Sequence, residues 1–484
     1  MRGIESMAYP LPEDIQVRVH AGDFKGALGL IDIYIREGIA PLLNQRLELE
    51  KQRIERMSAN YPYTRLQAIN MAQVAIPELT DAEFDEMELR GDIQYMYIDG
   101  QKRYFESFLS SLYRLRPDMA RRAGTFKGPK NELLDAAIDE IKQKGVLSYR
   151  MHICASLEVN ESAFQPGDYR VHLPLPAISA QQSDIRLIAA SDDLKSVCAE
   201  DAPVRTAYFE RHMDSNAPFF VEYEYTNTVK YFSMDMPAPA EPLYPSVPAP
   251  DADDLAELPG HIMFTPYLRA LAADICKDET DPLKKARLIY DYVTTHVRYS
   301  FMREYFLLPP IAEYVATGLK GDCGVQALLF ITLCRISGIP ARWQSGLSAS
   351  LTEAGSHDWA QFYAPGWGWL FADCSFGGGA LANGSRERWN YYFGNLDPFR
   401  MVANSRFQAR MEPEKKFPRN DPYDNQSGEC ENERKRFSSG EINCERKVVK
   451  AENSSDAAHA KYNVQYAAHT AALKRCGRGF KKRL

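Results

Sequence analysis

Residues 321–342 read GDCGVQALLFITLCRISGIPAR, and this stretch decides the fold of the chain. Side chains of one helix face recur along it at α-helical spacing, namely Val325, Leu328, Leu329, Thr332 and Leu333. We therefore predict a helix that begins at Cys323, directly after a Gly-Asp turn, and ends at Gly338, with Pro340 just beyond. A thiol at the start of a helix lies at the positive end of the helix dipole. The sequence thus predicts a lowered pKa and a reactive thiolate for Cys323.

His357 and Asp373 follow Cys323 in chain order and add the partners that a thiol nucleophile needs. His357 lies in HDWAQFY (357–363) and Asp373 in WLFADCS (369–375), two strand-like segments joined by a turn that contains Pro and Gly. A hairpin of this kind holds an imidazole and a carboxylate close together. A histidine can activate a thiol, and a carboxylate can orient the histidine. We therefore predict a catalytic triad of these three residues, although each of them alone would read as an ordinary structural residue.

From Asp281 to Asp373 the chain resembles the transglutaminase-like core, a branch of the papain-like cysteine hydrolases and acyltransferases. Four pieces carry the resemblance in order: the helix DPLKKARLIYDYVTTHVRY, the GDC string, the GIPAR string, and H-x-W followed by a Gly-rich turn and a strand that ends in Asp. The resemblance implies a helix bearing Cys323 packed on an antiparallel sheet bearing His357 and Asp373. Residues 152–190 are similar to the strand-rich region that precedes this core in bacterial members, so we expect a bacterial protein of several domains.

Composition and periodicity divide the chain into five parts and predict a multidomain α+β protein. The parts are a helical N-terminal region (1–145), a β-sandwich-like domain (146–236), a Pro-rich linker (237–260), the catalytic core (261–425) and a charged, partly disordered tail (426–484). Thr80 and Glu83 form a capping-box pattern in the first part. The tail ends in LKRCGRGFKKRL, which we interpret as a solvated basic end in preference to a nucleic-acid contact.

The composition fits a soluble protein, with 484 residues, 45% hydrophobic and 25% charged side chains, and a formal net charge of −7. The negative charge argues against nucleic-acid binding by the main body. No apolar run is long enough to span a bilayer, and the N-terminal MRGIESMAYPLPEDIQ lacks the apolar core of a signal peptide. The nine cysteines include no C-x-x-C pair, so we expect no structural metal, no cofactor and a reducing, cytoplasmic location.

The triad indicates cysteine-dependent acyl transfer on amide bonds of a peptide or protein, with glutamine among the candidate side chains. Hydrolysis is the favoured outcome because it requires no dedicated amine site. Amine transfer by a true transglutaminase and a non-catalytic peptide-binding or scaffold protein remain the alternatives. The backbone N–H of Cys323 is the expected oxyanion donor. The second donor stays open among Tyr299, Tyr305 and Tyr314.

Overall fold

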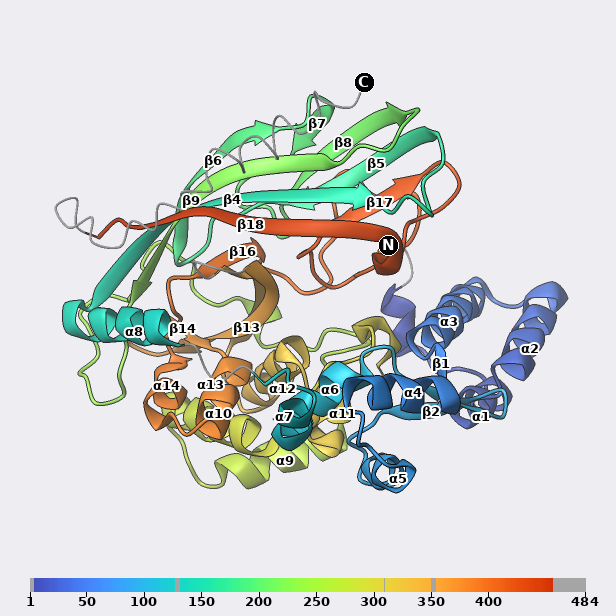
Figure 1. Cartoon of the computed structure of the whole chain (residues 1–484). Coiled ribbons are helices and arrows are strands. Elements are labelled where there is room, and N and C mark those ends of the chain that lie inside the picture. Colours follow the sequence, from blue (N-terminus) through green and yellow to red (C-terminus); the bar gives the residue numbers. More distant parts are fainter. Residues whose placement is uncertain (1–3, 127–130, 309, 350–353, 456–484) are drawn as a thin grey trace.

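The computed structural model describes residues 4–126, 131–308, 310–349 and 354–455. Helices and several β-sheets are combined in it. A two-sheet β layer lies on one side of the molecule, and most of the helices lie on the other (Figure 1). Within the described ranges, no helix is both long and apolar enough to cross a membrane.

The N-terminal region is mainly helical, as the sequence predicts. Its elements are η1 (Ile4–Ala8), α1 (Glu13–Ala21), α2 (Phe24–Glu37), α3 (Pro41–Asn60), β1 (Tyr63–Thr64), α4 (Arg65–Ala75), α5 (Asp81–Leu89), β2 (Tyr95–Ile98), β3 (Gln101–Tyr104), α6 (Phe108–Leu115), α7 (Pro117–Arg122) and α8 (Glu132–Lys144). The predicted capping box is present: Thr80 accepts from the N–H of Glu83, whose side chain accepts from the N–H of Thr80. A three-stranded sheet, β1-β3-β2, was not predicted, because strands of two to four residues are too short to give an alternating pattern.

The β layer consists of two four-stranded antiparallel sheets, with strand orders β17-β5-β8-β7 and β18-β4-β9-β6. The strands are β4 (Val146–Val159), β5 (Gly167–Pro174), β6 (Gln182–Ala190), β7 (Leu194–Val197), β8 (Thr206–Met213), β9 (Phe219–Lys230), β17 (Glu429–Asn432) and β18 (Ile442–Asn453), with η4 (Ser439–Glu441) before the last. Alternate side chains of β4 are buried. The rings of Phe209 and Phe219, one from each sheet, lie 5.8 Å apart, so the two sheets share one core.

The expectation of a tail from residue 426 is wrong over residues 429–453. β17 pairs with β5, and β18 runs antiparallel to β4 along its length, from Ile442 opposite Val159 to Asn453 opposite Tyr149. β18 lies at a sheet edge and contains many charged side chains with few large apolar ones, so its composition resembles that of a solvated segment. The basic stretch 473–484 lies outside the described residues.

The core that follows the linker has a five-stranded antiparallel sheet, order β15-β14-β13-β12-β16. Its elements are η2 (Ala252–Asp254), α9 (Pro266–Cys276), α10 (Pro282–His296), β10 (Arg298–Tyr299), η3 (Tyr305–Leu307), α11 (Ile311–Gly318), β11 (Lys320–Gly321), α12 (Cys323–Ile336), β12 (Ala341–Ala349), β13 (Ala354–Ala364), β14 (Gly368–Ala372), α13 (Cys374–Ala382), α14 (Arg386–Tyr391), β15 (Phe393–Gly394) and β16 (Arg400–Asn404). Helix α12 packs on this sheet, and Phe330 meets Phe362 of β13 with ring centroids 5.7 Å apart. A helix bearing Cys323 therefore lies on an antiparallel sheet bearing His357, as expected. Asp373 lies directly after β14 and is the N-cap of α13, so it is at the end of the sheet and not within a strand.

The Pro-rich linker packs onto the hairpin that carries Asp373. Leu243 donates its N–H to the carbonyl of Trp367 at 3.0 Å, and the Trp369 indole donates to the carbonyl of Pro248 at 2.9 Å. Tyr244 is buried between them. The linker thus supports β14 from outside.

Candidate active site

Cys323 is the first residue of α12, which confirms the predicted start of this helix. Asp322 is the N-cap, and its carboxylate accepts from the N–H of Val325 at 3.3 Å. The hydroxyl of Tyr305 donates to the same Asp322 oxygen at 2.5 Å. The thiol therefore lies at a well-fixed helix end.

His357 and Asp373 form a direct pair across the β13–β14 hairpin. His357 Nε2 lies 2.7 Å from Asp373 Oδ2, and the two residues are 4% and 0% exposed. The other oxygen of Asp373 accepts from the N–H of Phe376 at 2.9 Å, and the Phe376 ring lies against the imidazole with centroids 4.3 Å apart. The imidazole is thus fixed, and its Nδ1 is the nitrogen left for proton transfer.

Arg400, at the start of β16, is a third member of this pair that sequence reasoning missed. Its guanidinium is fully buried and lies 2.9 Å from Asp373 Oδ2 and 2.6 Å from Asp397 Oδ2. Burial alone would raise the pKa of Asp373, but His357 and Arg400 lower it to about 2. Burial lowers the pKa of His357, and Asp373 opposes that shift. The imidazole is therefore neutral and faces an ionised carboxylate.

The thiol of Cys323 makes its hydrogen bond with the neighbour of His357. Cys323 Sγ donates to Asp358 Oδ2 at 3.3 Å, and no hydrogen bond between Cys323 and His357 occurs within the described residues. Burial raises the pKa of Cys323 well above its usual value, and the acid groups of Asp358 and Asp322, once ionised, add to the shift. The expected lowering of this pKa is therefore wrong for the unliganded protein, because desolvation and two acids outweigh the helix dipole.

The raised pKa of Cys323 predicts how the thiol reacts with iodoacetamide. We expect the alkylation rate of the unliganded protein to reach half its maximum above about pH 8.5, the value of a free cysteine. Rate measurements between pH 5 and 11, with the labelled residue identified by mass spectrometry, provide the check. A midpoint near neutrality would show a preformed thiolate and contradict this prediction.

A cleft of about 620 Å³ opens beside the thiol. Its wall combines residues of α3, the segment around η3, the segment after β16 and strand β18. Asp322 and Asp358 are part of the wall, so the cleft reaches the helix end that carries Cys323. Arg56 of α3 joins two of these segments, since it pairs with Glu304 at 2.9 Å and donates to the carbonyl of Asn420.

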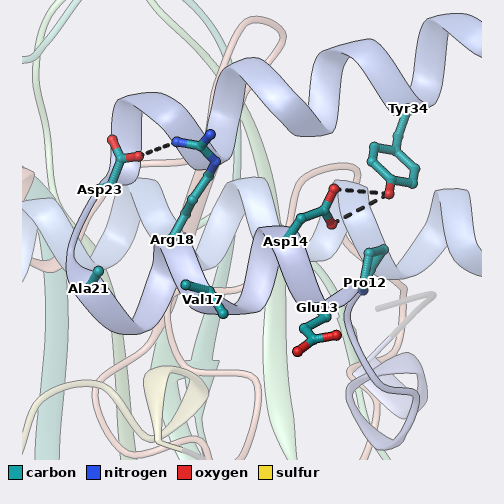
Figure 2. Close-up of a pocket in the computed structure, with 8 residues that line it drawn as sticks. All are labelled: Pro12, Glu13, Asp14, Val17, Arg18, Ala21, Asp23 and Tyr34. Atoms are coloured by element: carbon teal, nitrogen blue, oxygen red, sulfur yellow. Dashed lines mark hydrogen bonds and ion pairs between the residues drawn. The ribbon is translucent and has the colours of Figure 1, made fainter.

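A second hollow, of about 770 Å³, lies on the surface between α1 and α2 (Figure 2). Three of the charged groups on its wall already have partners: Arg18 pairs with Asp23 at 2.5 Å, and the hydroxyl of Tyr34 donates to Asp14 at 3.1 Å. Its wall includes neither Asp322 nor Asp358, the neighbours of the thiol that line the other cleft. The cleft beside Cys323 is therefore the candidate active site.

Two further cysteines of the core, and the tyrosine beside Asp322, have mainly structural surroundings. Cys334 and Cys374 are buried, at 0% and 2% exposure. Tyr305 donates its hydroxyl to Asp322, so this hydroxyl is already engaged. Among the described residues, no group of three or more His, Cys, Asp or Glu side chains is arranged to hold a metal ion.

A known protein family matches part of the core. Residues 269–374 match the transglutaminase-like superfamily. An uncharacterized protein of Haemophilus influenzae is 27% identical over 150 residues, which cover 25% of this chain and 40% of that protein. The chain thus spans less than half the length of that relative.

Two solved structures are also similar. A proposed cysteine protease from Cytophaga hutchinsonii is 15% identical, with a TM-score of 0.39, over 63% of this chain and 91% of that one. The periplasmic domain of TgpA from Pseudomonas aeruginosa is 14% identical, with a TM-score of 0.26, over 52% of this chain and 96% of that one. Sequence identities and TM-scores this low support no conclusion about the chemistry of this chain.

Proposed function

Since the chain carries a transglutaminase-like domain, we propose that it is a cysteine-dependent hydrolase of peptide or side-chain amide bonds. The observation that carries the proposal is the arrangement of side chains around the start of α12, beside the cleft. A cysteine at a helix start lies against the strand that bears His357, and the imidazole is fixed by Asp373 at 2.7 Å. These are the parts of a thiol nucleophile, a proton carrier and an orienting carboxylate.

In the proposed reaction, Sγ of Cys323 attacks the amide carbon, and the thiol proton passes to Nδ1 of His357. The C–N bond then breaks, the same proton goes to the leaving amine, and a thioester remains. Water attacks the thioester with His357 as its base, the S–C bond breaks, and the thiolate regains a proton. Asp373 stabilises the imidazolium throughout.

In the unliganded protein the thiol of Cys323 is hydrogen-bonded to Asp358, and this bond sets a condition on the reaction steps above. The thiol must turn from Asp358 toward His357 when a substrate enters, because the unliganded protein holds it as a neutral thiol. Proton transfer then accompanies the attack and does not precede it. Loose contacts of this kind in an unliganded site commonly tighten in the substrate complex.

The fate of the thioester separates hydrolysis from the two alternatives. Incubation with N,N-dimethylcasein and dansylcadaverine should release ammonia or acid-soluble peptides while leaving the casein non-fluorescent. Fluorescent casein would instead identify an amine transferase, and binding without either product would favour a peptide-binding scaffold. The same mixture with iodoacetamide-treated protein is the control, and it should give no product.

Two further expectations belong to this proposal. The substrate is a peptide or protein that presents an amide group to the cleft, and the cytoplasm is the proposed compartment. Fractionation of cells that produce the full chain, with detection by antibody, tests the location. Recovery with periplasmic or secreted proteins would contradict it.

A further inference from the structure

We propose that Asp358, as a protonated carboxylic acid, is the second hydrogen-bond donor to the oxyanion that forms when Cys323 attacks a carbonyl group. The inference rests on the proposed function, since it takes Cys323 as the nucleophile. It assigns a donor that sequence reasoning left open among three tyrosines, and it gives Asp358 a role separate from that of its neighbour His357.

The first argument is position. Asp358 Oδ2 lies 3.3 Å from Cys323 Sγ, one hydrogen bond from the atom that forms the new bond. The carbonyl oxygen of a substrate bonded at Sγ lies within the same reach, because it is attached to the carbon that the sulfur attacks. Gln426 donates to the other oxygen, Oδ1, at 2.5 Å, which holds the carboxyl with Oδ2 toward the sulfur. Asp358 also lines the cleft through which a substrate reaches the thiol.

The second argument concerns the other donor. Asp322 accepts from the N–H groups of Gly324 and Val325, and the N–H of Cys323 is not among those it caps. This N–H belongs to the first residue of α12, where amides have no partner within the helix. The Cys323 amide and the Asp358 carboxyl therefore approach the sulfur from the helix and from the strand. Two such donors are the usual composition of an oxyanion hole.

The third argument is the protonation of Asp358. The residue is 4% exposed, and its hydrogen-bond partners among the described side chains are Cys323, Gln426 and Asp424, none of which is a cation. The groups that face it are mostly acidic or neutral: Cys323 and Asp322 at α12, Tyr299 and Tyr305 before it, and Asp421, Asp424 and Gln426 after β16. Ser345 of β12 lies opposite it, and Arg446 of β18 lines the same cleft but bonds to Ser356 and to the carbonyl of Gln426.

Burial, with Asp322 as the next cause, raises the pKa of Asp358 well above its usual value. A carboxylic acid kept neutral in this way has one O–H to donate, which a carboxylate lacks. In the resting protein Oδ2 accepts from the thiol. When the thiol proton leaves for His357 and charge develops on the substrate oxygen, the carboxyl donates its O–H to that oxygen. No proton is transferred from Asp358, so the balance of the reaction is unchanged.

The test compares two reactions of the same thiol. p-Nitrophenyl acetate acylates a thiol through an oxyanion, and the p-nitrophenolate burst measures that step. Iodoacetamide alkylates the same thiolate by direct displacement, in which no oxyanion forms. Removal of an oxyanion donor should therefore slow the first reaction and spare the second, a pattern that a merely structural residue would not give.

Asp358→Ala should lower the burst rate by about 10²- to 10³-fold relative to the alkylation rate of the same variant. The ratio is the readout because Asp358 also raises the pKa of the thiol, which affects both reactions. Asp358→Asn should retain most of the burst rate, because the amide N–H replaces the acid O–H as donor. Tyr299→Phe is the control for Tyr299, a tyrosine that also lies near the thiol, and it should react as the wild type does. Circular dichroism melts establish that each variant is folded.

Three results would overturn the inference. If the burst rate of Asp358→Asn is as low as that of Asp358→Ala, the reaction needs Asp358 as a proton acceptor and not as a donor. Wild-type acylation in Asp358→Ala would remove it from the reaction, and a large loss in Tyr299→Phe alone would assign the donor to the tyrosine. A burst that persists in Cys323→Ala would instead refute the proposed function, which separates that failure from a failure of the inference.

Discussion

Cys323→Ala is expected to lower the turnover of dimethylcasein by at least about 10⁴-fold, since nothing else at the site supplies the attacking atom. The fold should persist. Asp322 caps α12 through its own side chain, and the alanine keeps the helix start intact. Product release per hour and the thermal melting curve of the variant are the two measurements. Turnover close to that of the wild type would remove Cys323 from the mechanism.

Cys334→Ala is the matched control, because it changes the same atoms in the same helix. Cys334 is fully buried within α12, away from the helix start. Its loss should destabilise the protein by roughly 1 kcal/mol, as for other small buried groups, with turnover retained. Opposite outcomes for the two cysteines would separate catalysis from packing. Equal losses of turnover would indicate that both substitutions act through stability.

The helix of Cys323 and the hairpin of His357 could be predicted because their signals are local. Apolar spacing, an Asp cap and a Gly-Pro stop all lie within residues 321–342, and each acts through neighbours in the chain. The pKa of Cys323 could not be predicted in the same way. It depends on burial and on Asp358 of β13, which only the folded sheet brings to the thiol.

Long-range pairing explains the other errors. β18 pairs with β4, but β4 (Val146–Val159) and β18 (Ile442–Asn453) lie far apart in the sequence, and no local pattern predicts their pairing. Arg400 was missed for a related reason. The string DPFR (397–400) reads as a surface turn, and only the packing of β16 beside β12 turns Arg400 toward Asp373. Groups that act through tertiary contacts lack a sequence signal of their own.

Arg400→Met should produce a large loss of stability. The guanidinium is fully buried and lies within 3 Å of two buried carboxylates, 2.9 Å from Asp373 and 2.6 Å from Asp397. Its removal leaves both carboxylates without a cation in a desolvated site, which typically costs about 3–5 kcal/mol. Urea unfolding at pH 7 measures the effect. Arg400→Lys keeps the charge and should recover part of the loss, and Arg18→Met, at an exposed pair with Asp23, should change little.

The pH dependence of this loss has a definite sign. The pKa of Asp373 is about 2 in the folded protein, below its usual value of 3.8, so its ionised form stabilises the fold fully above that usual value. This contribution disappears as the pH falls from about 4 toward 2. Without Arg400 the pKa of Asp373 rises, so acid unfolding of Arg400→Met should begin at a higher pH than that of the wild type. Because Asp373 also orients His357, turnover should fall as Asp373 loses its charge. A variant with wild-type stability and wild-type acid unfolding would show that Arg400 supports neither the carboxylate nor the imidazole.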